Sequence, residues 1–198
     1  NKATKVSVIE IDFSKPRAIE QCVADITSKK SVDVALIAQG FMPEQNAAQN
    51  NLNIVKQTVD VTATSVVLFA EAFAKRFEIQ GAGKLGVIGS VAGDRGRKTN
   101  YVYGAAKAFV ATYVSGLAHR FAGTSVSVTL IKPGPTRSAM TAHIAEAGAR
   151  LAEPSRVAID IVNGIEAQKP VVYTPRIWQI IMMVIRHLPR RIFHRLNV

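Results

Sequence analysis

The stretch that decides the fold runs from Leu85 to Lys107 and reads LGVIGSVAGDRGRKTNYVYGAAK. Its first residues, up to Ser90, are mostly apolar and predict a buried strand. A polar, basic loop follows and leads into an Ala-rich helix, on which Tyr103 and Lys107 lie four residues apart and share one face. A strand that passes through a loop into a helix is typical of an alternating α/β fold.

The same stretch brings a phenol, an ammonium and a hydroxyl together. A free tyrosine has a pKa near ~10 and exchanges protons poorly at neutral pH. A lysine a few ångströms away favours the phenolate and lowers that pKa, which makes proton exchange with an alcohol or a carbonyl feasible. We therefore predict Tyr103 as general acid or base, Lys107 as the group that lowers its pKa, and Ser90 as the hydroxyl that holds the substrate oxygen.

Strands and helices alternate along the rest of the chain. Strands are predicted at 6–11, 34–38, 84–90, 125–131 and 170–174, and helices at about 14–28, 48–77, 101–121 and 154–168. This order predicts a doubly wound, three-layer α/β fold around a parallel sheet with right-handed crossovers. We expect one catalytic domain over 1–175 and a basic amphipathic tail over 176–198.

Composition limits the class of protein. With 198 residues, of which 48% are hydrophobic, the chain is long and apolar enough for one packed domain. Its single cysteine, Cys22, excludes a disulfide framework and fits a reducing compartment. The four histidines lack the spacing of metal ligands, and no apolar run reaches the ~20 residues of a membrane span. We expect a cytoplasmic protein without a metal.

The motifs and their spacing resemble the short-chain dehydrogenase/reductase family. They are Ser90, Tyr103-x-x-x-Lys107 thirteen residues later, Lys132-Pro133-Gly134 thirty residues after the tyrosine, and Ala38-Gln39-Gly40 at the end of an earlier apolar strand. The resemblance covers about residues 6–174. It implies a Rossmann-like fold and hydride transfer between NAD or NADP and a carbonyl or secondary alcohol, on a sugar or a lipid-linked substrate.

The resemblance also implies a cofactor site. Its residues are Asp12, Ala38, Gln39, Gly40, Tyr103, Lys107, Pro133, Gly134, Thr136 and Ser138. Asp12 corresponds to a residue that contacts adenine, and Gln39 departs from the Asn-Ala-Gly pattern that the family has at this place. The segment 140–153 corresponds to a substrate lid, on which His143 is expected to face solvent.

Asp60 falls where the family has a fourth catalytic residue, an Asn that holds a proton-relay water. A carboxylate accepts hydrogen bonds but cannot donate them as an amide does. Its charge could also pair with Lys107 and oppose the effect of that cation on Tyr103. We expect the exchange Asp60→Asn to preserve or raise turnover.

One family element has no counterpart in the sequence. The family's sheet order is 3-2-1-4-5-6-7, and a glycine-rich phosphate loop follows its first strand. The strand predicted at 6–11 corresponds to the third, and no such loop stands before it. We therefore expect the first βαβ unit to be missing from this chain, and with it the residue that separates NAD from NADP.

Basic residues raise two further questions. Formal net charge is +11, and Arg95, Arg97 and Lys98 lie between Ser90 and Tyr103. These three cations predict either an anionic substrate or a solvated basic loop. Interleaved aromatic residues or a reading motif are absent, so nucleic-acid binding is disfavoured.

The tail combines an apolar run, 177–185, with arginines at 186, 190, 191 and 195. It predicts either a helix in a membrane interface, at the inner face of the membrane, or a helix that covers the core or a dimer seam. The ending is similar to that of a bacterial branch of the family, the decaprenylphosphoryl-keto-pentose reductases, which act on a lipid-linked sugar phosphate.

Two classes of function other than an active enzyme stay open: a catalytically impaired scaffold or cofactor sensor, which Gln39 and Asp60 favour, and the basic binder disfavoured above. Related enzymes pair helices equivalent to 48–77 and 101–121 about a two-fold axis. A homodimer or homotetramer is therefore expected.

Overall fold

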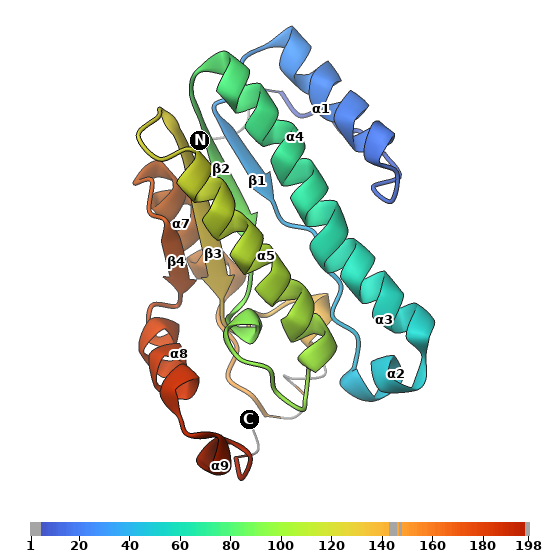
Figure 1. Ribbon diagram of the computed structural model, residues 1–198, viewed down its shortest axis with the longest axis vertical. Helices are drawn as coiled ribbons and strands as arrows, with labels where there is room; N and C mark the ends of the chain where they lie inside the picture. Colours follow the sequence, from blue (N-terminus) through green and yellow to red (C-terminus); the bar gives the residue numbers. More distant parts are fainter. Residues whose placement is uncertain (1–4, 143–145, 147, 197–198) are drawn as a thin grey trace.

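A computed structural model describes residues 5–142, 146 and 148–196 (Figure 1). Four parallel strands in the order β1-β2-β3-β4 form the sheet of this part of the chain. They are β1 (Val34–Ile37), β2 (Gly83–Ile88), β3 (Val126–Pro133) and β4 (Val171–Thr174). The predicted doubly wound α/β class is confirmed, and four of the five predicted strands are present within two residues at each end.

Helices cover both faces of this sheet. They are α1 (Pro16–Lys29), α2 (Gln45–Asn50), α3 (Leu52–Val59), α4 (Ser65–Gln80), α5 (Tyr101–Arg120), α7 (Pro154–Glu166), α8 (Ile177–His187) and α9 (Arg190–Phe193), with the short turns η1 (Asp60–Thr64), η2 (Val91–Asp94) and η3 (Ala139–Thr141). In Figure 1, α4 and α5 lie in front of the sheet, and α7 lies behind it. Helix α1 packs against α4, outside the sheet itself.

The core lies between the sheet and the pair α4–α5. Leu85 and Val87 of β2 are fully buried there against residues such as Phe77 and Val110. A strand covered on both faces needs apolar side chains at consecutive positions, which explains the mostly apolar stretch before Ser90 that predicted β2. The opposite face is covered less completely, because Leu36 of β1 remains 47% exposed.

The strand predicted at 6–11 is not present. These residues have no regular structure, and Val6, Val8 and Ile9 are 76%, 91% and 53% exposed. Their β-branched composition favours an extended backbone, but a strand needs a neighbour to satisfy its N–H and C=O groups. Among the described residues β1 pairs with β2 alone, so 6–11 has no partner in this sheet.

The long helix predicted over 48–77 is interrupted twice. Asn51 ends α2 and caps α3, where its side chain accepts a hydrogen bond from the Asn53 backbone. Further on, η1 is a π-helical turn in which the Ser65 N–H bonds to the Asp60 carbonyl. Such turns inside helices are often found at functional sites.

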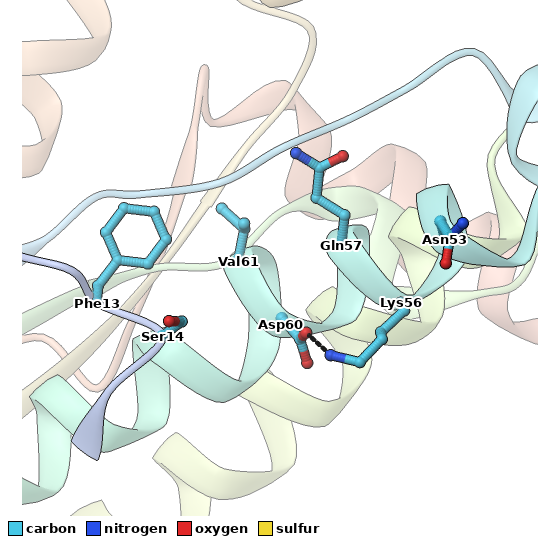
Figure 2. A pocket seen from close by; sticks show the side chains of 7 residues that line it. All are labelled: Phe13, Ser14, Asn53, Lys56, Gln57, Asp60 and Val61. Carbon is cyan, nitrogen blue, oxygen red and sulfur yellow. Dashed lines mark hydrogen bonds and ion pairs between the residues drawn. The ribbon is translucent and has the colours of Figure 1, made fainter.

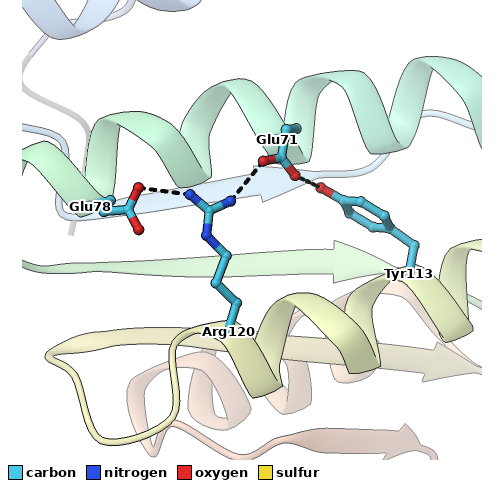
Figure 3. Close-up of polar contacts among 4 residues, drawn as sticks. All are labelled: Glu71, Glu78, Tyr113 and Arg120. Atoms are coloured by element: carbon cyan, nitrogen blue, oxygen red, sulfur yellow. Dashed lines mark hydrogen bonds and ion pairs between the residues drawn. The ribbon is translucent and has the colours of Figure 1, made fainter.

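Polar side chains tie α4 to α5 on their solvent side (Figure 3). Arg120 bonds to Glu71 and to Glu78, at 2.7 Å each, and the Tyr113 hydroxyl donates to Glu71 at 2.5 Å. Exposed ion pairs of this kind each stabilise by at most about 1 kcal/mol. Together they join α4 to α5, the helix that carries Tyr103.

Candidate active site

Ser90 lies just beyond the carboxyl end of β2. Its backbone is extended, and its hydroxyl accepts a hydrogen bond from the Ala92 N–H at 3.0 Å, which caps η2. The capping contact uses an acceptor lone pair and leaves the hydroxyl proton free to donate. Ser90 is thus held at the sheet edge where ligands of open α/β folds bind.

Lys107 reaches the same edge from α5. Its side chain is buried, and its Nζ donates to the Ile88 carbonyl at 2.7 Å. A side chain at Gly40, beyond the end of β1, would come within 3.6 Å of that Nζ. The ends of β1 and β2 therefore meet at the Lys107 ammonium, whose pKa burial lowers to about 8.

Tyr103 stands one helical turn before Lys107, whose Nζ is 5.8 Å from the centre of the phenol ring. Burial raises the pKa of Tyr103 to about 12, and a hydrogen bond with Ser90 opposes this rise. The predicted lowering of that pKa by Lys107 is therefore wrong for the chain by itself. Loss of hydration outweighs an ammonium that sits over the ring and is not hydrogen-bonded to the phenol oxygen.

Two glycines allow η2 to approach α5 closely. A Cβ on Gly93 would come within 2.8 Å of the Lys107 and Ala108 backbones, and a Cβ on Gly104 within 2.9 Å of the Ala92 carbonyl oxygen. Contacts this short leave no room for any side chain, so only glycine fits at either position. This close packing brings the Ser90 loop against the helix that carries Tyr103 and Lys107.

The segment after β1 is held by a threonine that the sequence did not single out. Thr62 of η1 is fully buried and bonds through its hydroxyl to both the N–H and the carbonyl of Phe41, at 2.9 Å each. The Gln39 amide donates to the Ser65 hydroxyl at 3.2 Å, so it turns toward the helix. Ala38 is exposed at the end of this strand.

The predicted Pro-Gly bend lies at the end of β3. Pro133 is its last residue, and the Gly134 N–H bonds to the Thr174 carbonyl at 2.9 Å. A Cβ on Gly134 would come within 2.0 Å of the indole Nε1 of Trp178, so this glycine makes room for α8. Trp178 was not singled out from the sequence, because its contact is with a residue 44 positions away.

Thr136 and Ser138 belong to a loop that is bonded within itself. The Thr136 hydroxyl donates to the Gly134 carbonyl at 3.0 Å. The Ser138 N–H donates to the Thr141 hydroxyl at 3.0 Å, and the two hydroxyls are 3.2 Å apart. Both predicted cofactor contacts lie in one preformed loop beside the Pro-Gly bend. The predicted position of His143 lies outside the described residues, as does part of the segment 140–153.

A buried ion pair joins three strand ends around this bend. Lys132 of β3 is 2.5 Å from Asp94 of η2, and the Tyr173 hydroxyl of β4 donates to the same carboxylate at 2.8 Å. The side chains of Lys132 and Asp94 are only 11% and 2% exposed. The sequence marked Lys132 as part of a motif and gave Asp94 no role.

Asp60 lies apart from these groups. Its carboxylate pairs with Lys56 and is 44% exposed (Figure 2). It lines a cavity of about 250 Å³, with Asn53, Gln57 and Val61 from the same helix and with Phe13 and Ser14 from the chain before α1. The expected pairing with Lys107 is therefore replaced by a pairing on the helix surface.

Asp12 is exposed and forms a turn with Ser14 just before α1. It accepts from the Ser14 N–H at 3.0 Å and from the Ser14 hydroxyl at 2.6 Å, and these bonds lower its pKa. Lys15 lies 3.3 Å from the same carboxylate. The contacts present are those of a local turn, and the adenine contact stays a prediction.

The three cations of the basic loop have different surroundings. Arg95 donates to the Leu188 carbonyl at 2.8 Å and to the Ile185 carbonyl, and its guanidinium lies 3.8 Å from the centre of the Phe193 ring. Arg97 is half-buried, and its Nε has no hydrogen-bond partner in the described part of the chain. Burial lowers the pKa of Arg97, while Asp94 opposes this. Lys98 is exposed.

The family model described as "short chain dehydrogenase" matches residues 1–149. The chain belongs to the short-chain dehydrogenase family. Among curated proteins, an uncharacterized oxidoreductase of Mycobacterium tuberculosis is 30% identical over 195 residues, which are 98% of this chain and 78% of that protein. One of Streptomyces coelicolor is 27% identical over 195 residues, 98% of this chain and 76% of the relative.

Solved short-chain dehydrogenases share the fold. A short chain dehydrogenase from Burkholderia cenocepacia, in complex with NADP, gives a TM-score of 0.85 at 16% identity over 100% of this chain and 84% of that one. A putative NAD(P) dependent gluconate 5-dehydrogenase from Beutenbergia cavernae, with bound NADP, gives 0.72 at 20% identity over 82% and 72%. The family, the fold class and the oxidoreductase class acting on CH–OH groups are thus confirmed, and family membership implies a nicotinamide cofactor, NAD or NADP.

The residues present fit such a cofactor. The Lys107 ammonium has three protons to donate, and one contact, to Ile88, is found among the described residues. A buried cation with unused donors beside a glycine suits the hydroxyl groups of a ribose. In the same described part of the chain, no three His, Cys, Asp or Glu side chains gather as metal ligands.

Proposed function

We propose that this short-chain dehydrogenase reduces a carbonyl compound to a secondary alcohol, with Tyr103 as the general acid. The observation that carries the proposal is the convergence of Ser90, Tyr103 and Lys107 at the carboxyl end of β2, held by the contact between η2 and α5. A phenol with a pKa of about 12 is protonated at neutral pH, which is the form a proton donor needs.

Each of the three side chains has its own part in the reaction. When bound, the nicotinamide cofactor supplies the hydride. The Ser90 hydroxyl donates a hydrogen bond to the carbonyl oxygen and aligns it. Tyr103 gives its proton to that oxygen as negative charge develops there, and the Lys107 ammonium stabilises the phenolate left behind and binds ribose hydroxyls.

The proposed substrate carries an anionic group. Arg97 supports this proposal, because its buried Nε lacks a hydrogen-bond partner within the described residues. The negative charge of Asp94 offsets the effect of burial on Arg97 only in part. Arg95 does not take part, since α8 and Phe193 occupy its guanidinium. A phosphate ester, including a lipid-linked sugar phosphate, fits a bidentate guanidinium.

We also propose a homodimer or homotetramer through α3–α4 and α5. Phe109 on α5 is 56% exposed, and Val59 at the end of α3 is 40% exposed. Apolar side chains on adjoining helices are the kind of surface that association covers. Mass photometry of the parent and of Phe109→Ser checks this proposal, and loss of the oligomer in the variant is the expected result.

The test of the catalytic proposal follows cofactor absorbance with NADPH and NADH over a panel of neutral and anionic ketones. Tyr103→Phe should lower kcat by at least about 100-fold, because the general acid is lost. Cofactor binding, measured by fluorescence, should persist in that variant. Turnover close to that of the parent in Tyr103→Phe would contradict the proposal. If the parent binds the cofactor but turns over no ketone, the result would favour the alternative function of a cofactor sensor.

A further inference from the structure

The outer face of α8 is apolar and open. Its inner face is covered, because Met182 is fully buried and Trp178 packs on Gly134. Four apolar side chains remain more than half exposed on the other side: Ile177, Ile180, Met183 and Val184, at 54%, 57%, 57% and 53%. Their spacing of three and four residues places them on one face of the helix. Beyond it, Ile192 on α9 is 51% exposed.

Cations lie at both ends of this face. The arginines at 176, 186, 190, 191 and 195 are all exposed, and no Asp or Glu follows Glu166 in the sequence. Among the described residues none of the five forms an ion pair with a carboxylate. Arg186 turns to the inner face, where it acts on Tyr173 beside Asp94. The outer surface therefore combines an apolar stripe with four arginines that, among the described residues, pair directly with no carboxylate.

The helix that carries this face is fixed to the body of the protein. Arg95 bonds to the carbonyls of Ile185 and Leu188 at its carboxyl end and stacks on Phe193 of α9. At the other end Trp178 fills the space above Gly134. The segment is therefore a rigid part of the surface and is presented by the fold with a defined orientation.

We propose that the outer face of α8, together with α9, docks on an anionic lipid bilayer. Apolar side chains that enter the boundary between headgroups and acyl chains, flanked by arginines that reach anionic headgroups, are the features of an interfacial helix. A second copy of this chain fits less well, because the same face on both copies would oppose four arginines with four arginines. Among the described residues no helix is long and apolar enough to cross a membrane, so the contact proposed is with its surface.

Docking would also orient the catalytic end of the molecule. Helix α8 contacts η2, the turn that follows Ser90, and β4. Only α8 would then stand between a bilayer on its outer face and the turn that follows Ser90. This consequence rests on the proposed function, whereas the docking itself does not.

The experiment measures co-sedimentation of the full chain with vesicles of phosphatidylcholine, with and without phosphatidylglycerol. We expect binding to the vesicles that contain phosphatidylglycerol, weakened by salt, and little binding to phosphatidylcholine alone. The double variant Arg190→Gln/Arg191→Gln should bind about thirtyfold more weakly, given roughly fivefold for each arginine. Ile180→Ser/Met183→Ser should bind at least about tenfold more weakly. Both side chains are exposed in the free protein, and the variant loses the gain from burying their apolar surface in the bilayer.

A matched control lies on α7, where Ile159 and Val162 are 55% and 57% exposed. Ile159→Ser/Val162→Ser should bind vesicles as the parent does, and thermal melting checks that every variant folds. Equal losses in the α7 and α8 variants, or full binding by Ile180→Ser/Met183→Ser, would overturn the proposal. The proposal would also be overturned if the parent did not bind anionic vesicles but formed a dimer, and the α8 variant were monomeric. Turnover of a water-soluble ketone, measured in parallel, reports separately on the proposed function.

Discussion

Burial sets the protonation of the two ionisable side chains at the centre of the site. The pKa of Tyr103 rises to about 12, and that of Lys107 falls to about 8, because each loses hydration of its charged form. At neutral pH the pair is therefore a neutral phenol beside an ammonium. That combination suits proton donation to a carbonyl oxygen better than proton removal from an alcohol.

The pH profile of carbonyl reduction follows from these values. Tyr103 stays protonated up to about pH 12, so the first group to change is Lys107, whose pKa is about 8. We expect kcat/KM for reduction to be constant below pH 8 and to fall as the pH rises through that value, because the ammonium is lost. Lys107→Arg should remove this fall, since a guanidinium stays charged. A profile of the parent that is level well above pH 8 would show that Lys107 does not govern the rate.

Asp60 gives a second prediction for a single residue. Its carboxylate pairs with Lys56 at the surface, not with Lys107. Asp60→Asn should keep kcat within about twofold of the parent, or raise it, because an exposed pair stabilises by at most about 1 kcal/mol and the charge lies outside the Ser90–Tyr103–Lys107 cluster. Steady-state kinetics beside a urea unfolding curve measures both effects. Loss of turnover in a folded variant would assign the carboxylate a catalytic task of its own.

At the scale of elements, the packing of η2 on α5 determines where the Ser90 hydroxyl stands relative to Tyr103. Gly93→Ala must push η2 away from the Lys107 backbone, since the added Cβ would lie 2.8 Å from it. Overpacking of this kind costs about 1–3 kcal/mol of stability. An ångström of displacement near reacting groups costs up to about 100-fold in rate, so we expect kcat to fall by about tenfold to 100-fold.

Gly96, in the same loop, is the matched control. A Cβ there meets nothing within 4 Å, and Gly96→Ala should leave kcat and the melting temperature close to those of the parent. The comparison separates close packing from loop flexibility, because both variants restrict the backbone equally. Similar losses in the two variants would indicate that loop flexibility, and not the η2–α5 contact, limits turnover.

The local sequence pattern predicted most helices and strands. It failed where the structure of a segment depends on a neighbouring segment. The apolar run at 34–38 and the Ala-rich helix after residue 100 form the predicted strand and helix, because apolar runs and helix periodicity are properties of the segment itself. The burial of β1 on both faces that the run predicted is wrong, since Val34 and Leu36 are 41% and 47% exposed. Residues 6–11 have equally strong β-branched character, but strand formation depends on a neighbouring strand. The π-helical turn at Asp60 gave no periodic signal at all.

At the scale of the whole molecule, contacts between distant segments were the part that sequence could not supply. The alternation of apolar residues and arginines after residue 176 left open whether the segment covers the core or faces a membrane. Trp178 over Gly134 and Arg95 on the end of α8 show that one face does pack on the domain. The motif spacing found Ser90, Tyr103 and Lys107, whereas Thr62 and Asp94 become visible only once β1, β3 and β4 are placed around them.

The Asp94–Lys132 pair carries the last prediction, because it ties η2 to β3 and, through Tyr173, to β4. Asp94→Asn leaves a buried ammonium without its counter-charge and should lower the free energy of unfolding by about 3–5 kcal/mol. Glu20→Gln, which removes the exposed Lys75–Glu20 pair, should change it by less than about 1 kcal/mol. The pKa of Tyr173, about 12 because of burial and of Asp94, should fall in Asp94→Asn, and ultraviolet titration measures this shift independently of urea unfolding. Equal stability of the two variants would mean that the pair contributes nothing beyond a surface contact, and that the three strand ends are held by packing alone.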